Sequence, residues 1–325
     1  MPIVLRLLSR LAISLALLLA VSIAVFASVE ILPGDPATTI LGRNASPDRV
    51  DALREQLGLD NSPVVRYWDW LKSTAQGDLG LQATGNRSVW STISTPLRNT
   101  AILAVVAFAT TSIAAVGGGL IAGRRPGNRT DRVLSIGTLS IVAMPEFVIA
   151  GLLISLFAFR LDWVSSVSLV PLGGTPLDAP STLILPVATI TLVAGSYGLR
   201  LVRALVAEAS AQPFVEAARL AGVRETAVLR RHLLPSVAAP TAQVLAFSVP
   251  YLIGGTVIVE QVFAYPGLGS LLVEQIARRD VTVVEAIAMI MTTAVIAGFL
   301  IADLLGALTA RHIPRSDSRP SAALP

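Results

Sequence analysis

Residues 216–235 read EAARLAGVRETAVLRRHLLP, and this stretch contains two glutamates and four arginines. Long apolar runs flank it on both sides, and the whole chain of 325 residues is 53% hydrophobic but only 14% charged. A soluble domain normally carries about 25% charged residues. The stretch is therefore a polar insert in a chain whose composition indicates an integral membrane protein.

Apolar runs long enough to cross a bilayer occur six times along the chain. A helix needs about 20 mainly apolar residues to cross a hydrocarbon core about 30 Å thick. The predicted spans are Leu11–Val29, Asn99–Gly123, Val133–Phe159, Ala179–Leu199, a run from about Ser236 to Val259, and Val283–Leu308. The third run contains Glu146, and the sixth contains Glu285 and Asp303. We expect an all-α integral membrane fold with six transmembrane helices.

The first apolar run could also be a cleaved signal peptide, because Arg6 and Arg10 precede it. The run is longer than the about 7–15 apolar residues of a signal peptide, and SVEILPGDP (28–36) is a poor cleavage site. We therefore expect the run to be retained as a membrane helix.

The arginines predict which side of the membrane each segment faces. Six spans place both termini on one side, and the segments on that side hold most of the arginines outside the long segment 30–98. Arginine and lysine favour cytoplasmic segments, whereas long translocated segments are largely exempt from this rule. The prediction is that both termini are cytoplasmic, and that residues 216–235 lie in the cytoplasm with them.

These spans divide the chain into four predicted parts. They are an N-terminal transmembrane helix (1–30), an extracytoplasmic segment (31–98), a five-helix core (99–310) with a cytoplasmic loop at about 200–235, and a cytoplasmic tail (311–325). The extracytoplasmic segment contains VVRYWDWL (64–71). This aromatic patch is either an anchor at the membrane surface or a contact for an extracytoplasmic partner.

The sequence lacks the motifs of several common enzyme and metal sites. A P-loop needs a lysine directly after a glycine, but the only lysine, Lys72, follows Leu71. His232 and His312 are too far apart for a zinc protease helix, and the absence of cysteine excludes thiolate metal sites. The basic residues are not interleaved with aromatic ones, so they do not indicate nucleic acid. We expect no active site, cofactor or metal in this chain.

Glu146 follows Pro145 inside the third predicted span. A carboxylate at membrane depth is costly and often lies on a substrate or proton pathway. It can also be a structural carboxylate near a bend caused by the proline. If the pathway interpretation applies, the chain could be a secondary transporter that uses intramembrane carboxylates.

The insert itself has the pattern of a short amphipathic helix. Pro213 fits its first turn, and Gly222 is well placed to end it in a left-handed conformation. Helical spacing predicts one shared face for Phe214, Ala217, Ala218 and Ala221. A second helical piece is predicted from about Glu225 to Leu234, stopping at Pro235. Such a helix can enter a groove on another protein or lie on anionic lipid.

EAARLAG, followed after nine residues by HLLP, resembles the EAA signature of ABC importer permeases. Its positions here are Glu216, Ala217, Ala218, Gly222, Leu234 and Pro235, and Arg219 lies within it as a further candidate coupling residue. The histidine in HLLP resembles the branch that imports dipeptides, oligopeptides and nickel. So do LPGDP (32–36), LGLD (57–60), GDLG (77–80) and VFAYPGLG (262–269), which occur in that family's order. The chain departs from the family at TARHIPR (309–315), where DPRIR is common.

The resemblance implies a permease subunit with the type I ABC importer fold in a bacterial inner membrane. Such a subunit forms the pathway together with a second homologous permease. Two separate ABC ATPase subunits use ATP and Mg, and an extracytoplasmic binding protein delivers the solute. The resemblance further implies that the EAA residues couple the ATPases to the pathway, and that the solute is a peptide or a related small molecule.

Overall fold

The computed structural model describes residues 3–31, 36–41, 45–56, 58–82, 87–171 and 173–309. The predicted tail 311–325 and most of the LPGDP motif lie outside these ranges. The described residues form helices joined by turns and loops, with one isolated antiparallel bridge between Leu81 and Ser88. The predicted all-α architecture is confirmed.

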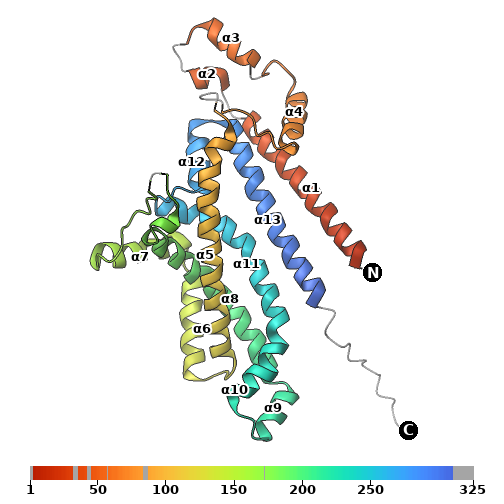
Figure 1. Cartoon of the computed structure of the whole chain (residues 1–325), viewed down its shortest axis with the longest axis vertical. Coiled ribbons are helices and arrows are strands. Elements are labelled where there is room, and N and C mark those ends of the chain that lie inside the picture. The colour runs from red at the N-terminus through yellow and green to blue at the C-terminus, as the bar shows by residue number, and fades with distance from the viewer. Residues whose placement is uncertain are drawn as a thin grey trace.

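Among the described residues, five helical segments are long and apolar enough to cross a membrane. They contain α1 (Ile3–Glu30), α5 (Val89–Gly123), α8 (Ser181–Ser210), α11 (Leu234–Val262) and α13 (Val281–Thr309). Figure 1 shows that the start of α1 and the end of α13 are the ends of these helices nearer to α9 (Pro213–Leu220) and α10 (Glu225–Val228), although both stop short of them. This arrangement agrees with both termini and the insert lying on one side of the membrane.

The third predicted span is broken into two helices. The first is α6 (Arg129–Val142), and the second comprises α7 (Glu146–Leu153) and the π-helix η1 (Ile154–Arg160), bent from the first by 107°. Pro145 lies at the break, where it lacks a backbone donor and disfavours a helical conformation for the residue before it. Counted as one span, this bent pair brings the total to six.

Small residues let α5 and α8 approach backbone to backbone. Gly119 and Gly123 of α5 face α8, and a Cβ on Gly123 would lie only 2.7 Å from the carbonyl oxygen of Arg203. A Cβ on Gly119 would lie 2.7 Å from the Cβ of Val202. The G-x-x-x-G spacing in this segment therefore marks a close helix contact.

A buried carboxylate organises the start of α12 (Leu268–Arg278). Glu260 is fully buried, and its carboxylate accepts hydrogen bonds from the Gly269 and Ser270 backbone N–H groups at 2.7 and 3.1 Å. The hydroxyl of Thr100 donates to the same carboxylate at 2.6 Å. These bonds satisfy N–H groups of the first turn that have no partner within the helix. A Cβ on Gly267 would lie 2.2 Å from this carboxylate, which explains one glycine of VFAYPGLG.

Tyr265 joins the same region to α5. Its hydroxyl is buried and donates to the backbone oxygen of Asn99 at 2.8 Å. Burial, with the nearby Glu260 carboxylate, raises the pKa of Tyr265, so the hydroxyl stays protonated as a donor.

The segment predicted to be extracytoplasmic contains α2 (Pro36–Leu41), α3 (Pro47–Gln56) and α4 (Pro63–Ala75). In α4, the Tyr67 hydroxyl lies 2.8 Å from the Ser22 hydroxyl of α1, and the rings of Tyr67 and Trp70 pack on Phe26. Trp68 is 58% exposed. The aromatic patch therefore holds α4 against α1, a role that neither of the two predicted interpretations included. The short helix η2 (Pro176–Asp178) precedes α8.

Candidate coupling site

The predicted helix in the insert is α9, which begins at Pro213 and ends at Leu220. Gly222 follows it with a φ of +77°, and its N–H donates to the carbonyl of Arg219 at 3.0 Å. The next residue, Val223, donates to the carbonyl of Ala218 at 3.1 Å. Gly222 thus closes the helix in the left-handed conformation that glycine adopts without strain.

Two opposite faces of α9 have different surroundings. Val215 and Ala218 are buried in a cluster with residues of α8 and of η3 (Leu229–Leu233). Phe214, Ala217, Leu220 and Ala221 are exposed, and Leu220 is 83% exposed. The prediction that Ala218 shares one face with Phe214, Ala217 and Ala221 is therefore wrong. Ala218 lies on the same side of the helix as Val215, and the bundle covers both residues. Leu220 takes its place on the outward apolar face.

The two charged residues of the EAARLAG stretch point in different directions. Glu216 is exposed. The Arg219 Nε lies 3.2 Å from Glu225 Oε1, and its terminal nitrogens donate to the carbonyls of Ser210 at 3.4 Å and Arg124 at 3.5 Å. Ser210 ends α8 and Arg124 follows α5, so these carbonyls lack helical partners. Arg219 therefore attaches α9 to the ends of two membrane helices.

The second helical piece does not stop at Pro235. α10, η3 and α11 form one continuous helix from Glu225 to Val262. In a regular α-helix a proline ring clashes with the carbonyl four residues earlier. Here that carbonyl belongs to the widened π-helical turn of η3, which explains why the helix continues through Pro235. Leu234 and Pro235 line an apolar pocket of about 390 Å³ between α5, α8 and α11. They connect the insert to a span and are not on the outward face of α9.

Glu146 stands at the first turn of α7 and faces α11, where a Cβ on Gly255 would lie 3.4 Å from its Oε2. Its Oε1 is buried and has no hydrogen-bond partner among the described residues. Figure 1 shows α7 far from α9, so the structure does not bring Glu146 to the insert. No group of three or more metal-ligating side chains occurs in the described part of the chain.

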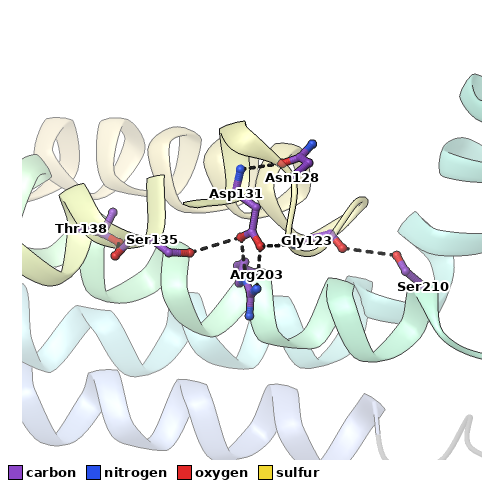
Figure 2. A network of polar contacts seen from close by, with 8 residues as sticks. Gly123, Asn128, Asp131, Ser135, Thr138, Arg203 and Ser210 are labelled. Carbon is purple, nitrogen blue, oxygen red and sulfur yellow. Dashed lines mark hydrogen bonds and ion pairs between the residues drawn. The ribbon is translucent and has the colours of Figure 1, made fainter. Parts of the chain in front are cut away.

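The sequence reasoning missed an ion pair near the insert, drawn in Figure 2. Arg203 of α8 donates to both carboxylate oxygens of Asp131 in α6, at 2.9 and 2.8 Å. Asp131 also accepts the Gly127 N–H at 2.7 Å and the Ser135 hydroxyl at 3.2 Å. The available signal was the helical spacing of Asp131, Ser135 and Thr138, which share one helix face although Asp131 lies two residues before the predicted span begins.

The fold and this site define a multi-pass membrane protein with a short helix, apolar on its outward face, at one end of its bundle. Comparison with known proteins makes this class more specific. The chain belongs to the family "Binding-protein-dependent transport system inner membrane component", which matches residues 115–314. The N-terminal part of that membrane component matches residues 3–104.

Two relatives illustrate the family. A protein of Brucella suis described as a peptide transport system permease is 35% identical over 302 residues, covering 92% of this chain and 95% of the relative. The glutathione transport system permease protein GsiC of Escherichia coli K12 is 31% identical over 288 residues, covering 89% and 92%.

This chain is therefore a membrane subunit of an ABC importer, a multi-pass protein of the bacterial inner membrane. The predicted fold class and the resemblance to importer permeases are confirmed. A permease of a binding-protein-dependent system works with a substrate-binding protein and an ATPase. The assignment favours an ABC importer over the alternative of a secondary transporter.

Proposed function

We propose that this chain forms half of a transmembrane pathway for peptides or related small solutes. A second homologous permease subunit supplies the other half. The names of the relatives support this solute class, because one is described as a peptide permease and another as a permease for glutathione, itself a tripeptide.

Two ABC ATPase subunits supply the energy by binding ATP and Mg and hydrolysing the nucleotide. An extracytoplasmic binding protein delivers the solute. The permease itself needs no cofactor in this scheme. The sequence supports this division of labour, because Lys72 is the only lysine and does not stand in a P-loop.

The observation that carries the proposal is the two-sided structure of α9. Its inward face packs into the bundle, whereas its outward face leaves apolar side chains exposed beside Glu216. A helix of this kind fits a groove on another protein. Glu216 and Ala217 would contact the ATPase directly, while Ala218, Arg219 and Gly222 hold the helix in place. Leu234 and Pro235 would pass its displacement into α11.

The ATPase must bind the two states of the permease with different affinities to move it between them. A partner with equal affinity for both states would shift nothing. Because α9 is attached by Arg219 to the ends of α5 and α8, a displacement of α9 reaches two membrane helices. The ATP-bound and nucleotide-free ATPase would therefore favour different arrangements of these helices.

A second role in the same function is proposed for Glu146. A purely structural carboxylate would be expected to have its buried oxygens paired, but the buried Oε1 of Glu146 lacks a partner among the described residues. This observation favours contact with a donor group of the passing solute. Glu146→Gln should slow import without changing the melting temperature, and an unchanged import rate would contradict this role.

Copurification tests the proposed function. The tagged chain, coexpressed with its ATPase and binding protein, should bring down the ATPase. The double variant Glu216→Lys with Ala217→Asp should remain in the membrane but lose the ATPase, because it places a reversed charge and a buried carboxylate in the contact. Glu274→Lys on α12 also reverses an exposed negative charge and should keep the ATPase. Wild-type recovery of the ATPase with the double variant would refute the docking role of α9.

A further inference from the structure

The inward face of α6 is polar, which is unusual for a helix within a predicted membrane span. Asp131 and Thr138 are its buried residues, and Ser135 lies between them on the same face. The outward face carries Val133 and Ile136, which are 70% and 59% exposed. The fully buried side chains that attach α6 to the bundle are therefore polar, and the apolar Leu134 and Ile141 are only half-buried.

The ion pair between Asp131 and Arg203 supplies this attachment. Asp131 is 3% exposed, and Arg203 reaches its two oxygens through two parallel bonds. This paired geometry fixes direction as well as distance. The Gly127 N–H donates to the same carboxylate from the loop before α6. The position of α6 is therefore specified by where Arg203 lies.

Arg203 in turn lies in a part of α8 that packs closely against α5. A Cβ on Gly123 would lie 2.7 Å from the Arg203 carbonyl, so the two backbones are in contact at this position. The end of α8, at Ser210, accepts a hydrogen bond from Arg219 of α9. A continuous set of contacts thus runs from α9 through α8 to Asp131 in α6.

The far end of α6 is the break at Pro145. Beyond it α7 begins with Glu146, and the two helices meet at 107°. A change in the position of α6 must be accommodated at this break, because it is the point where the helical hydrogen bonds are interrupted. The break is the natural hinge between the inner half of the span and α7.

We propose that Asp131 and Arg203 are positioning residues of the transport cycle, which make α6 follow α8 and so carry the displacement of α9 to the break at Pro145. This inference rests on the proposed coupling of α9 to an ATPase. The pair acts through geometry and contacts neither the solute nor the nucleotide.

The test uses a reporter cysteine beside the break. The chain has no cysteine, so Phe147→Cys, at a side chain that is 58% exposed in the isolated subunit, gives this subunit a single thiol beside the break. The rate at which a fluorescent maleimide labels this subunit is measured in the purified complex with its ATPase, before and after trapping with ATP and vanadate. In the parent Phe147→Cys protein the rate should change several-fold on trapping.

The decisive variant adds Asp131→Leu and Arg203→Met to this parent. Replacing both members of a buried ion pair by apolar residues of similar size is often neutral for stability. The complex should therefore assemble and trap nucleotide, but the labelling rate should change less than two-fold. The matched control, Glu274→Leu with Arg278→Met, removes an exposed ion pair and should keep the full change.

Three outcomes would count against the proposal. A full change in the double variant would overturn it. If the double variant does not assemble, Arg203→Lys decides, because lysine keeps the charge but cannot make two parallel bonds. A full change with Arg203→Lys would overturn the proposal, whereas a reduced change at a normal melting temperature would support it. No change in the parent would contradict the ATPase coupling itself, and the proposal with it.

Discussion

Replacing Gly222 by alanine isolates the conformational requirement at the end of α9. The residue has a φ of +77°, and an added Cβ would meet no atom within 4 Å. Alanine therefore fits the space, and its only penalty is the left-handed backbone conformation. That penalty is about 1–2 kcal/mol for a residue with a side chain. It shifts the equilibrium away from the observed turn between α9 and α10 by about 5- to 30-fold.

Because the turn fixes the direction in which α9 projects, the affinity for the ATPase should fall by a similar factor. The affinity is measured by titrating purified ATPase onto the permease in nanodiscs. Gly77→Ala is the matched control, since Gly77 has a φ of +84° and no atom within 4 Å of an added Cβ, but lies in the segment predicted to be extracytoplasmic. It should cost the same in backbone strain and leave the ATPase affinity unchanged.

Gly222→Pro should have a larger effect than Gly222→Ala. Proline fixes φ near about −65° and removes the N–H that bonds to the Arg219 carbonyl at 3.0 Å. This variant should insert in the membrane but fail to couple ATP hydrolysis to import. The reasoning is refuted if Gly222→Ala binds the ATPase with wild-type affinity, or if Gly77→Ala weakens binding equally.

Two further predictions concern stability and are read from melting temperatures in detergent. Gly267→Ala should destabilise the protein by about 1–3 kcal/mol or more, because the new Cβ would overlap the buried Glu260 carboxylate. Gly254→Ala, which adds a Cβ in open space, should be neutral or slightly stabilising, and equal melting temperatures would contradict the overlap. Arg203→Met alone should cost about 3 kcal/mol because it leaves the Asp131 carboxylate buried without its partner. A wild-type melting temperature for this variant would show that the carboxylate finds another partner.

The membrane helices could be predicted from the sequence because their signal is local. A run without charges, such as that between Asp178 and Arg200, is long enough to cross a bilayer whatever lies around it. The structure extends most of these runs at one or both ends; α5, for example, begins at Val89 although Arg98 precedes the predicted start. An arginine can be part of a membrane helix near its end, because its long side chain carries the charged group out to polar surroundings.

The buried polar contacts could not be predicted, because they join residues far apart in the chain. Glu260 directly follows the fifth predicted span, which ends at Val259. It is nevertheless fully buried, and Thr100 and the start of α12 donate hydrogen bonds to its carboxylate oxygens. Asp131 lies just before the third predicted span, and Arg203 lies just after the fourth. Their pairing depends on how α6 packs against α8, and no local pattern carries that information.

The candidate site lies between these two cases. Periodicity predicted α9 and its end at Gly222 correctly, since both depend on neighbouring residues. It could not decide which apolar residues face the bundle. Val215 and Ala218 both lie on the inward side, in the buried cluster. The outward apolar face therefore contains Leu220 in place of the predicted Ala218.

The most direct test of the coupling site compares two neighbouring residues of α9. Ala217 is exposed and Ala218 is only 9% exposed, and the chain has no cysteine of its own. Ala217→Cys and Ala218→Cys are each treated with a short thiol–thiol cross-linker in a complex whose ATPase carries single cysteines around its permease-facing groove. The account predicts a cross-link from Ala217→Cys and none from Ala218→Cys. No cross-link from Ala217→Cys, or equal cross-linking at both positions, would contradict the claim that α9 docks on the ATPase by its outward face.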